Sequence, residues 1–219
     1  MNFSYFFELL CGGIVKGSIY ALIALGYTMV YGIIQLINFA HGEIYMVGAF
    51  VALIVAGMLT LSGYSGMTVL LLAAVGAAIY AAAYGYTLEK IAYRPLRNAP
   101  RLSPLISAIG ASIFLMNYVQ LAQTPDFLPF PELVPDLPFL EPIAQFVSAV
   151  DLVILIVTTL TMIALSVLIK YTKVGKAMRA TQQDMVMARL VGINVDRVIS
   201  STFIIGSVLA AIGGVLIAS

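Results

Sequence analysis

Residues 44–88 read IYMVGAFVALIVAGMLTLSGYSGMTVLLLAAVGAAIYAAAYGYTL and contain no charged residue and no histidine. A membrane-spanning helix needs about 20 consecutive apolar residues, so this stretch is long enough to cross a bilayer twice. The turn-forming residues Ser62-Gly63-Tyr64-Ser65-Gly66 divide it near its middle. The sequence therefore predicts one membrane-spanning helix near 44–61 and a second near 67–88.

Four further runs without charge flank this stretch, at residues 17–40, 102–125, 152–169 and 198–219. The chain is 62% hydrophobic and only 10% charged, with a mean hydropathy of +1.04. These values exceed what a soluble domain needs to fill one core. We therefore expect an all-α fold, a polytopic transmembrane helical bundle of about six hydrophobic units, with residues 1–219 forming one domain. The final run ends at Ser219 without flanking charge, so we also expect the chain to be a C-terminally truncated fragment.

The basic residues are unevenly distributed, and their distribution predicts the orientation of the bundle. Ten of the eleven Lys and Arg residues fall within 90–101 and 170–197. Cytoplasmic loops carry an excess of Lys and Arg, so both segments should face the cytoplasm. Residues 126–141, which lie between these segments, are acidic and rich in proline. They predict an irregular external loop that serves either as a docking surface or as a rigid connector.

Polar residues interrupt the apolar sequence at Asn38-Phe39-Ala40-His41-Gly42-Glu43. A charge at the centre of a span costs about 2.5–3.5 kcal/mol, so Glu43 would need a partner or a polar cavity if it lay in the membrane. A helix break at that depth would place Asn38, Phe39, His41, Gly42 and Glu43 along a substrate path. The alternative is a simple cytoplasmic surface loop, which follows if every hydrophobic unit crosses the membrane completely. The depth of the break decides between the two.

Residues 172–196 form a cytoplasmic segment that is longer than a turn between two spans requires. Apolar residues alternate here with polar ones and predict short amphipathic helices, and Gly192-Ile193-Asn194 supplies a stop signal. Such a helix can dock into a groove on another protein. The alternative is a basic loop that lies against lipid headgroups.

Small residues recur every fourth position at Ala73, Ala77, Ala81 and Gly85, and again at Gly206, Ala210 and Gly214. This spacing permits close contact between helices in lipid. Alanine and glycine are abundant in this chain, so the same alignment also arises by chance.

Two motifs together resemble a known family. Gly17-Ser18-Ile19-Tyr20-Ala21-Leu22, followed by Asn38-Phe39-Ala40-His41-Gly42-Glu43, is similar to the branched-chain amino acid ABC transporter permeases of the LivH branch, and so is the segment from Gly175 to Arg197. The resemblance implies contact with ABC ATPase subunits through five residues of the cytoplasmic segment, namely Arg179, Asp184, Ala188, Arg189 and Gly192. Members of the family continue through further spans beyond the position where Ser219 stands.

The resemblance implies a permease subunit of an ATP-driven importer for branched-chain amino acids, multi-pass in the bacterial inner membrane. Its expected partners are the lipid bilayer, ABC ATPase subunits, a second homologous permease subunit and a periplasmic or extracellular amino-acid-binding protein, with no nucleic acid. No Gly-x-x-x-x-Gly-Lys-Ser/Thr loop occurs in the sequence, so a partner should hydrolyse ATP and the chain should need no cofactor of its own. The cargo remains open between leucine, isoleucine and valine and related solutes such as urea, amides or aromatic amino acids.

Two other classes of function are alternatives to an importer subunit. A self-contained secondary transporter or channel would use His41 and Glu43 to handle ions or protons, and it would need no ATPase. An intramembrane enzyme has no support, because no pair of nucleophile and base and no cofactor motif occurs within the spans. His41 and Glu43 lack a third ligand and Cys11 is the only cysteine, so the sequence predicts no metal site.

Overall fold

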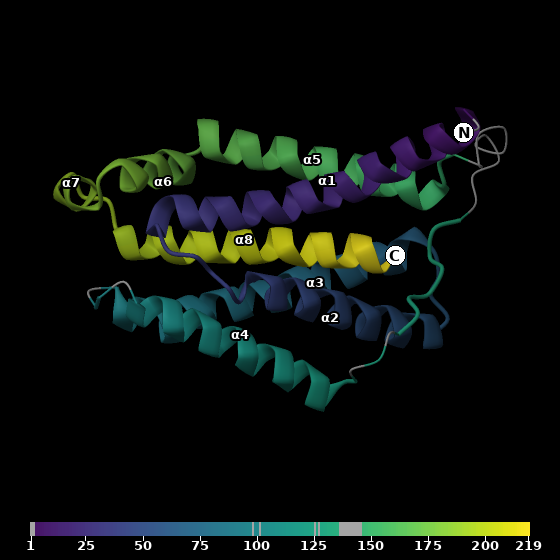
Figure 1. Cartoon of the computed structure of the whole chain (residues 1–219), viewed down its shortest axis with the longest axis horizontal. Helices are drawn as coiled ribbons and strands as arrows, with labels where there is room; N and C mark the ends of the chain where they lie inside the picture. The colour runs from purple at the N-terminus through teal and green to yellow at the C-terminus, as the bar shows by residue number, and fades with distance from the viewer. Residues whose placement is uncertain (1–2, 98, 101, 125, 127, 136–145) are drawn as a thin grey trace.

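Six long helices run along a common direction in the computed structural model, which describes residues 3–97, 99–100, 102–124, 126, 128–135 and 146–219 (Figure 1). The elements, in chain order, are α1 (Phe3–Ile34), α2 (His41–Leu61), α3 (Met67–Leu88), the π-helical turn η1 (Glu89–Tyr93), the 3-10 turn η2 (Arg94–Leu96), α4 (Leu102–Ala122), α5 (Ala149–Tyr171), α6 (Lys173–Gln183), α7 (Met185–Leu190) and α8 (Val195–Ala218). Six of these helices are long and apolar enough to cross a membrane. The fold is therefore the all-α transmembrane bundle of six units that the sequence predicts.

Helix α8 occupies the middle of the bundle, with α1 and α5 on one side and α2, α3 and α4 on the other (Figure 1). In its most apolar stretch, 61% of the residues are buried, whereas 17% are buried in the corresponding stretches of α4 and α5. The other spans therefore leave most of their residues at least partly accessible, as expected of helices that face lipid. The core of the protein is formed around α8.

Small residues allow the close packing around α8. A Cβ added at Gly48 of α2 would lie 2.7 Å from Cα of Ala211, and one at Gly214 would lie 2.5 Å from the carbonyl oxygen of Tyr45. Both distances are too short for any real side chain. The small-residue stripes of α3 and α8 are buried along their whole length. They make close helix contacts, so chance alignment does not explain them.

The connections fall at two opposite ends of the bundle. The segments 35–40, 89–97 and 172–194 lie at the end marked by α6 and α7 in Figure 1, whereas the turn at 62–66 and the described residues between α4 and α5 lie at the other. This alternation agrees with six crossings. The basic segments share one end, which the positive-inside rule assigns to the cytoplasm. We call it the cytoplasmic end and the opposite one the external end.

Two helix boundaries differ from those that the uncharged runs predict. The first span was expected at 17–40, but α1 begins at Phe3 and ends at Ile34. Glu8 and Lys16 lie on exposed positions of α1, where a charged side chain does not interrupt a helix and can reach toward the bilayer surface. The helix stops because Gln35 adopts a left-handed conformation with φ 57°.

The segment between α4 and α5 has no regular secondary structure at residue 126 or at residues 128–135. This agrees with the irregular conformation that its prolines predict. Asp136 and Glu141, which belong to the predicted acidic loop, lie outside the described residues, as does Arg101 of the basic segment.

Candidate functional site: a helix break inside the bundle and a cytoplasmic helical segment

The chain does not form a simple surface loop between α1 and α2. Residues 35–40 run back from the cytoplasmic end into the bundle, and α2 begins well inside it (Figure 1). Asn38 holds this segment in place, because its Oδ1 accepts hydrogen bonds from the backbone N–H of Ala40 at 3.2 Å and from the hydroxyl of Tyr93 at 3.0 Å. Its carbonyl oxygen accepts from the N–H of His41 at 3.2 Å. A buried amide thus replaces the helical bonds that the break removes.

The contacts of His41 show how deep the break lies. A Cβ added at Gly26 of α1 would lie 3.2 Å from the His41 ring and 3.0 Å from the carbonyl oxygen of Gly206. Gly206 stands at the middle of α8, so His41 also lies near the middle of the bundle. Its ring packs edge-on against Tyr27, with 5.9 Å between the ring centroids. His41 is 2% exposed and occupies a packing position.

Glu43 lies at a similar depth on a more open side of α2. Its Oε1 accepts a hydrogen bond of 2.8 Å from the hydroxyl of Ser112, which stands at the midpoint of α4. Phe39 and Gly42 are exposed beside it, and a Cβ added at Gly42 would meet no atom within 4 Å. The predicted path residues therefore divide into two groups. Asn38 and His41 are buried and stabilise the break, whereas Phe39, Gly42 and Glu43 face accessible space.

A second polar site joins η1, η2 and the residue after η2 to α8 at the cytoplasmic end. The carboxylate of Glu89 is fully buried and contacts the guanidinium of Arg97 and the hydroxyl of Ser200, the latter at 2.7 Å. Arg97 also pairs with Asp196 in the first turn of α8, and Arg94 reaches the same carboxylate at 3.0 Å. We call these five residues the Glu89 cluster.

Sequence reasoning counted Arg94 and Arg97 only as topological charges and did not find the Glu89 cluster. Asp196, the partner of both arginines, and Ser200, which donates to Glu89, lie on α8, about 100 residues further along the sequence, so no local pattern joins them. The one available signal was Glu89, an acidic residue at the end of a predicted span.

The cytoplasmic segment folds into the two short helices α6 and α7. Asp184 ends α6 and begins α7, since its side chain accepts hydrogen bonds from the N–H groups of Val186 and Met187. Gly192 ends α7 with φ +86°, a conformation that glycine adopts without strain. The guanidinium of Arg179 donates to the carbonyl of Lys170 at the end of α5. Asp184 and Gly192 thus set the ends of the two helices, and Arg179 ties α6 to the end of α5.

The residues predicted to contact an ATPase are not equally accessible. Arg179, Asp184, Arg189 and Gly192 are exposed, but Ala188 is 3% exposed and packs inside the cytoplasmic core beside Val195 and Val198. Its side chain has no free surface to offer a partner, because α7 needs a small residue where it meets the bundle. The contact of Ala188 with an ATPase stays a prediction, and in this structure its side chain packs within the subunit.

The face of α7 turned away from the bundle is apolar, and sequence reasoning missed it. Val186, Met187, Leu190 and Val191 are between 60% and 75% exposed at the cytoplasmic tip. Contiguous exposed apolar side chains mark sites of interaction with proteins or membranes. Their spacing of i, i+1, i+4 and i+5 was a usable signal, since it marks one helix face that the core of the bundle does not need.

Comparisons with known proteins agree with this architecture. The chain is 47% identical over 220 aligned residues to the high-affinity branched-chain amino acid transport system permease protein LivH of Escherichia coli, covering 99% of this chain and 71% of that protein. It is 45% identical to the corresponding permease protein BraD of Pseudomonas aeruginosa, over 97% and 71% of the two chains. A probable permease protein LivH of the archaeon Methanocaldococcus jannaschii is 27% identical, over 94% and 64%. No solved structure matches significantly.

The six apolar spans and these relatives identify a multi-pass protein of the bacterial inner membrane. The model of one protein family matches residues 9–219, which include the helix break, the Glu89 cluster and the cytoplasmic segment. The chain belongs to the family described as branched-chain amino acid transport system / permease component.

Proposed function

We propose that this chain is a permease subunit of an ATP-driven importer, and that it carries branched-chain amino acids across the membrane together with a second permease subunit. The observation that carries the proposal is the 47% identity to LivH over 99% of the chain. The chain itself contains no phosphate-binding loop of the Gly-x-x-x-x-Gly-Lys-Ser/Thr type, so separate ATPase subunits hydrolyse the nucleotide. A periplasmic or extracellular amino-acid-binding protein delivers the cargo.

The cytoplasmic segment couples this subunit to the ATPase. Its exposed apolar face, together with the exposed Arg189, offers a docking surface at the tip of the bundle. The buried side of the segment, at Met178 and Ala188, packs against the core that contains Val30 and Phe203. Motion of a docked ATPase therefore reaches α1 and α8 through packed side chains, and it shifts these spans between two arrangements.

The helix break supports a substrate path through the middle of the bundle. A carboxylate at the depth of Glu43 is costly in lipid, and such residues typically mark the path of a solute. Its partial exposure beside Phe39 and Gly42 fits that role. The path residues of this subunit are therefore Glu43, Gly42 and Phe39. Asn38 and His41 are buried and stabilise the helix break.

Uptake into proteoliposomes tests the proposal. Vesicles that contain this chain, its partner permease, the ATPases and the binding protein should accumulate labelled leucine, and omission of any one protein should abolish accumulation. Uptake that survives omission of the ATPases would contradict the proposal and favour a self-contained transporter.

A pair of variants tests the docking surface in the same system. Leu190→Asp should prevent co-purification of the ATPase while the spans remain folded, because a charge in an apolar contact is desolvated without a partner. Ser65→Asp, at an exposed position of the turn at the external end, is the matched control and should co-purify normally. Normal co-purification of the Leu190→Asp protein would refute the assignment of this surface.

A further inference from the structure

The short turns η1 and η2 connect α3 to α4 at the cytoplasmic end, and η1 directs two side chains with polar groups into the bundle. Glu89 and Tyr93, its first and last residues, are buried, whereas Lys90 and Ile91 between them are exposed. A π-helical turn is rare and is frequently found at functional sites. The two buried side chains bind different partners, so the segment 89–97 holds two parts of the fold at once.

The first of these parts is the beginning of α8. The hydroxyl of Ser200 donates to the Glu89 carboxylate at 2.7 Å, and Arg97 binds both Glu89 and Asp196. A buried carboxylate is costly to leave without its partner, so these contacts persist when α8 is displaced. The segment 89–97 and the first turns of α8 therefore move together.

The second part is the helix break. The Tyr93 hydroxyl donates to Oδ1 of Asn38 at 3.0 Å, and the Tyr93 ring packs on Phe203 of α8 with 5.1 Å between the ring centroids. The same Asn38 oxygen accepts the hydrogen bond from the backbone N–H of Ala40 that fixes the break. Tyr93 thus contacts α8 with its ring and the break with its hydroxyl.

The beginning of α8 is also the end of the cytoplasmic segment. Residues 191–194 alone separate α7 from α8. Met178 of α6 and Ala188 of α7 lie in one buried cluster with Tyr93 and Phe203. A displacement of α6 and α7 therefore reaches Tyr93 both along the chain, through α8, and through packed side chains.

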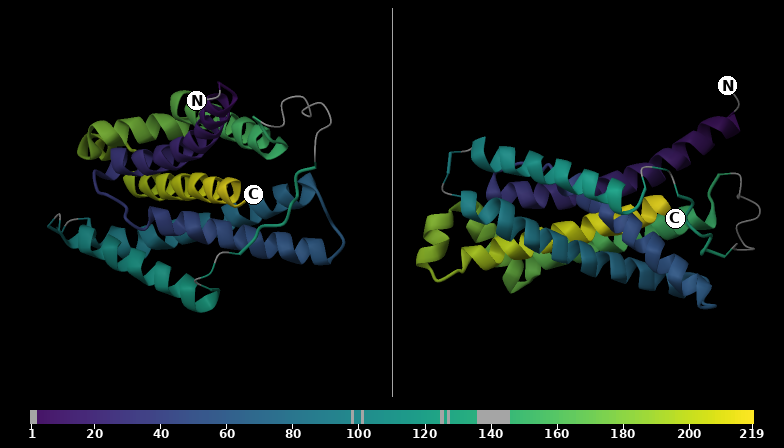
Figure 2. Two further views of the ribbon diagram at one scale, coloured as in Figure 1. Left: turned by 45° about the vertical axis from the view of Figure 1, so that its right-hand side comes forward. Right: turned by 90° about the horizontal axis from the view of Figure 1, so that it is seen from below.

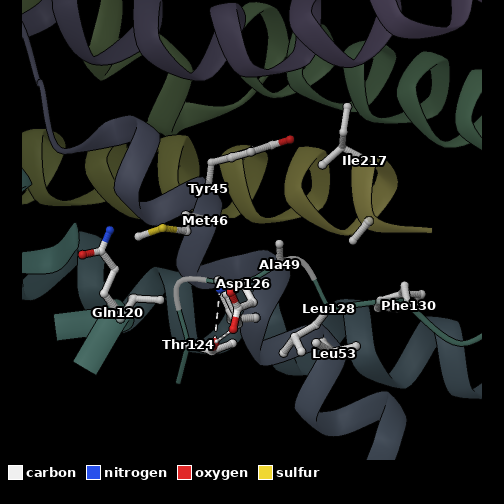
Figure 3. A pocket seen from close by; sticks show the side chains of 13 residues that line it. Tyr45, Met46, Ala49, Leu53, Gln120, Thr124, Asp126, Leu128, Phe130 and Ile217 are labelled. Carbon is white, nitrogen blue, oxygen red and sulfur yellow. Dashed lines mark hydrogen bonds between the residues drawn. The ribbon is translucent and has the colours of Figure 1, made fainter. Parts of the chain in front are cut away.

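The break in turn leads directly into α2, which forms one wall of a cavity of about 540 Å³ at the external end (Figure 3). Met46 and Leu53 belong to this wall, and α4 with the residues after it contributes the polar side chains of Gln120, Thr124 and Asp126. A shift of the break therefore moves the α2 wall of the cavity.

We infer that Tyr93 is a positioning residue that transmits motion of the cytoplasmic segment to the helix break, with its hydrogen bond to Asn38 as the link. The inference rests on the proposed function and specifies a route for the coupling. A second route runs through the end of α1, where Val30 and Ile33 lie in the same buried cluster and the chain continues into the break. Removal of the Tyr93 hydroxyl separates the two routes, because it leaves the packing of the ring and the whole of α1 unchanged.

A single cysteine on the break reports its motion. Ile37 is exposed, and its carbonyl oxygen lies 3.5 Å from the Tyr93 hydroxyl oxygen. The purified complex of both permeases and the ATPases should carry Ile37→Cys in a Cys11→Ser background, with partner subunits free of cysteine. Trapping of the ATPases with ATP and orthovanadate should change the rate of reaction with a maleimide several-fold. In the Tyr93→Phe complex the rate should be the same with and without trapping.

Tyr86→Phe is the matched control, because Tyr86 is exposed at the same end of α3 and its hydroxyl meets only the exposed Lys90, at 3.4 Å, within the described residues. This variant should keep the response of the parent. Transport gives a readout that a purely structural role would not change. Tyr93→Phe should co-purify with the ATPases and be half-saturated by the same concentration of leucine-loaded binding protein, yet hydrolyse several-fold more ATP for each leucine transported.

Two results would overturn the inference and leave the proposed function intact, provided that uptake still depends on ATP. One is a response of Ile37→Cys to trapping that persists in Tyr93→Phe, which would assign the coupling to α1. The other is a parent complex whose Ile37→Cys rate ignores trapping, because the break would then not follow the ATPases. Uptake independent of the ATPases would overturn the proposed function instead.

Discussion

At the scale of single residues, the sequence motif Asn38–Glu43 combines two kinds of position that look alike in a sequence. Asn38 and His41 turn inward and are 3% and 2% exposed, whereas Glu43 turns toward α4. A polar residue in an apolar run can therefore stabilise a break in a helix, as Asn38 does, or point toward a neighbouring helix, as Glu43 does. Only the direction of its side chain distinguishes the two.

The Glu89 cluster yields a prediction at this scale. Arg97→Gln leaves the fully buried Glu89 carboxylate without its cation, and breaking a buried ion pair in this way costs about 3–5 kcal/mol. We expect a marked loss of thermal stability in detergent, measured from the unfolding temperature of the purified chain. The double variant Glu89→Gln/Arg97→Gln removes the unpaired charge and should recover most of the loss. Equal stability of the single and double variants would contradict the pairing.

Gly192 gives a second prediction about a single residue. Its φ of +86° strains any residue with a β-branched side chain, by about 1–3 kcal/mol, although the space around it is open. Gly192→Val should therefore loosen the end of α7 and accelerate proteolysis between α7 and α8. Gly192→Asn is the control, because asparagine tolerates this conformation better than most residues. If both variants are digested at the parent rate, the left-handed turn is not needed.

At the scale of secondary-structure elements, α8 is the helix on which the others pack, and small residues make that packing possible. The uncharged runs indicated six spans but did not distinguish them by burial, although α8 is far more buried than α4. Composition did not reveal this difference, because a lipid-facing helix and a buried one are both apolar. The stripe of Gly206, Ala210 and Gly214 was the informative signal.

Substitutions at glycine test the packing of α8. Gly214→Ala places a methyl group 2.5 Å from the carbonyl oxygen of Tyr45, and overpacking of this kind costs about 1–3 kcal/mol. The variant should unfold at a lower temperature than the parent in the same detergent. Gly57→Ala, on α2, is the matched control, since its new methyl group would meet no atom within 4 Å. A drop for both glycines would point to a general effect of the substitution.

At the scale of the whole molecule, the chain crosses the membrane six times, and its basic segments meet at one end (Figure 2). That end also holds the Glu89 cluster and the exposed face of α7. An ATPase docked there would contact α6 and α7, whose buried side chains pack in one cluster with those of α1 and α8. The external end holds the cavity between α2 and α4.

This orientation can be tested with single cysteines in a Cys11→Ser background. Leu190→Cys should react with a membrane-impermeant maleimide in inside-out vesicles and stay unlabelled in right-side-out spheroplasts, because α7 is cytoplasmic. Ser65→Cys, in the opposite turn, should show the reverse pattern. Labelling of Leu190→Cys from the outside would contradict both the topology and the proposed coupling surface.

The sequence by itself determined the class of fold, the six spans, the sidedness implied by Lys and Arg, and the family resemblance. These properties depend on composition and on the order of residues along the chain. The thickness of the bilayer fixes the length of each apolar span, and the position of Lys and Arg fixes the orientation. Only the tertiary structure decided that α2 begins near mid-bundle, that His41 is buried, that Glu43 meets Ser112 of α4 and that Glu89 pairs with Arg97 beside α8. Glu43 and Ser112 are 69 residues apart in the sequence, and Glu89 and Ser200 are 111 apart, so no local pattern joins either pair. Helix packing brings them together.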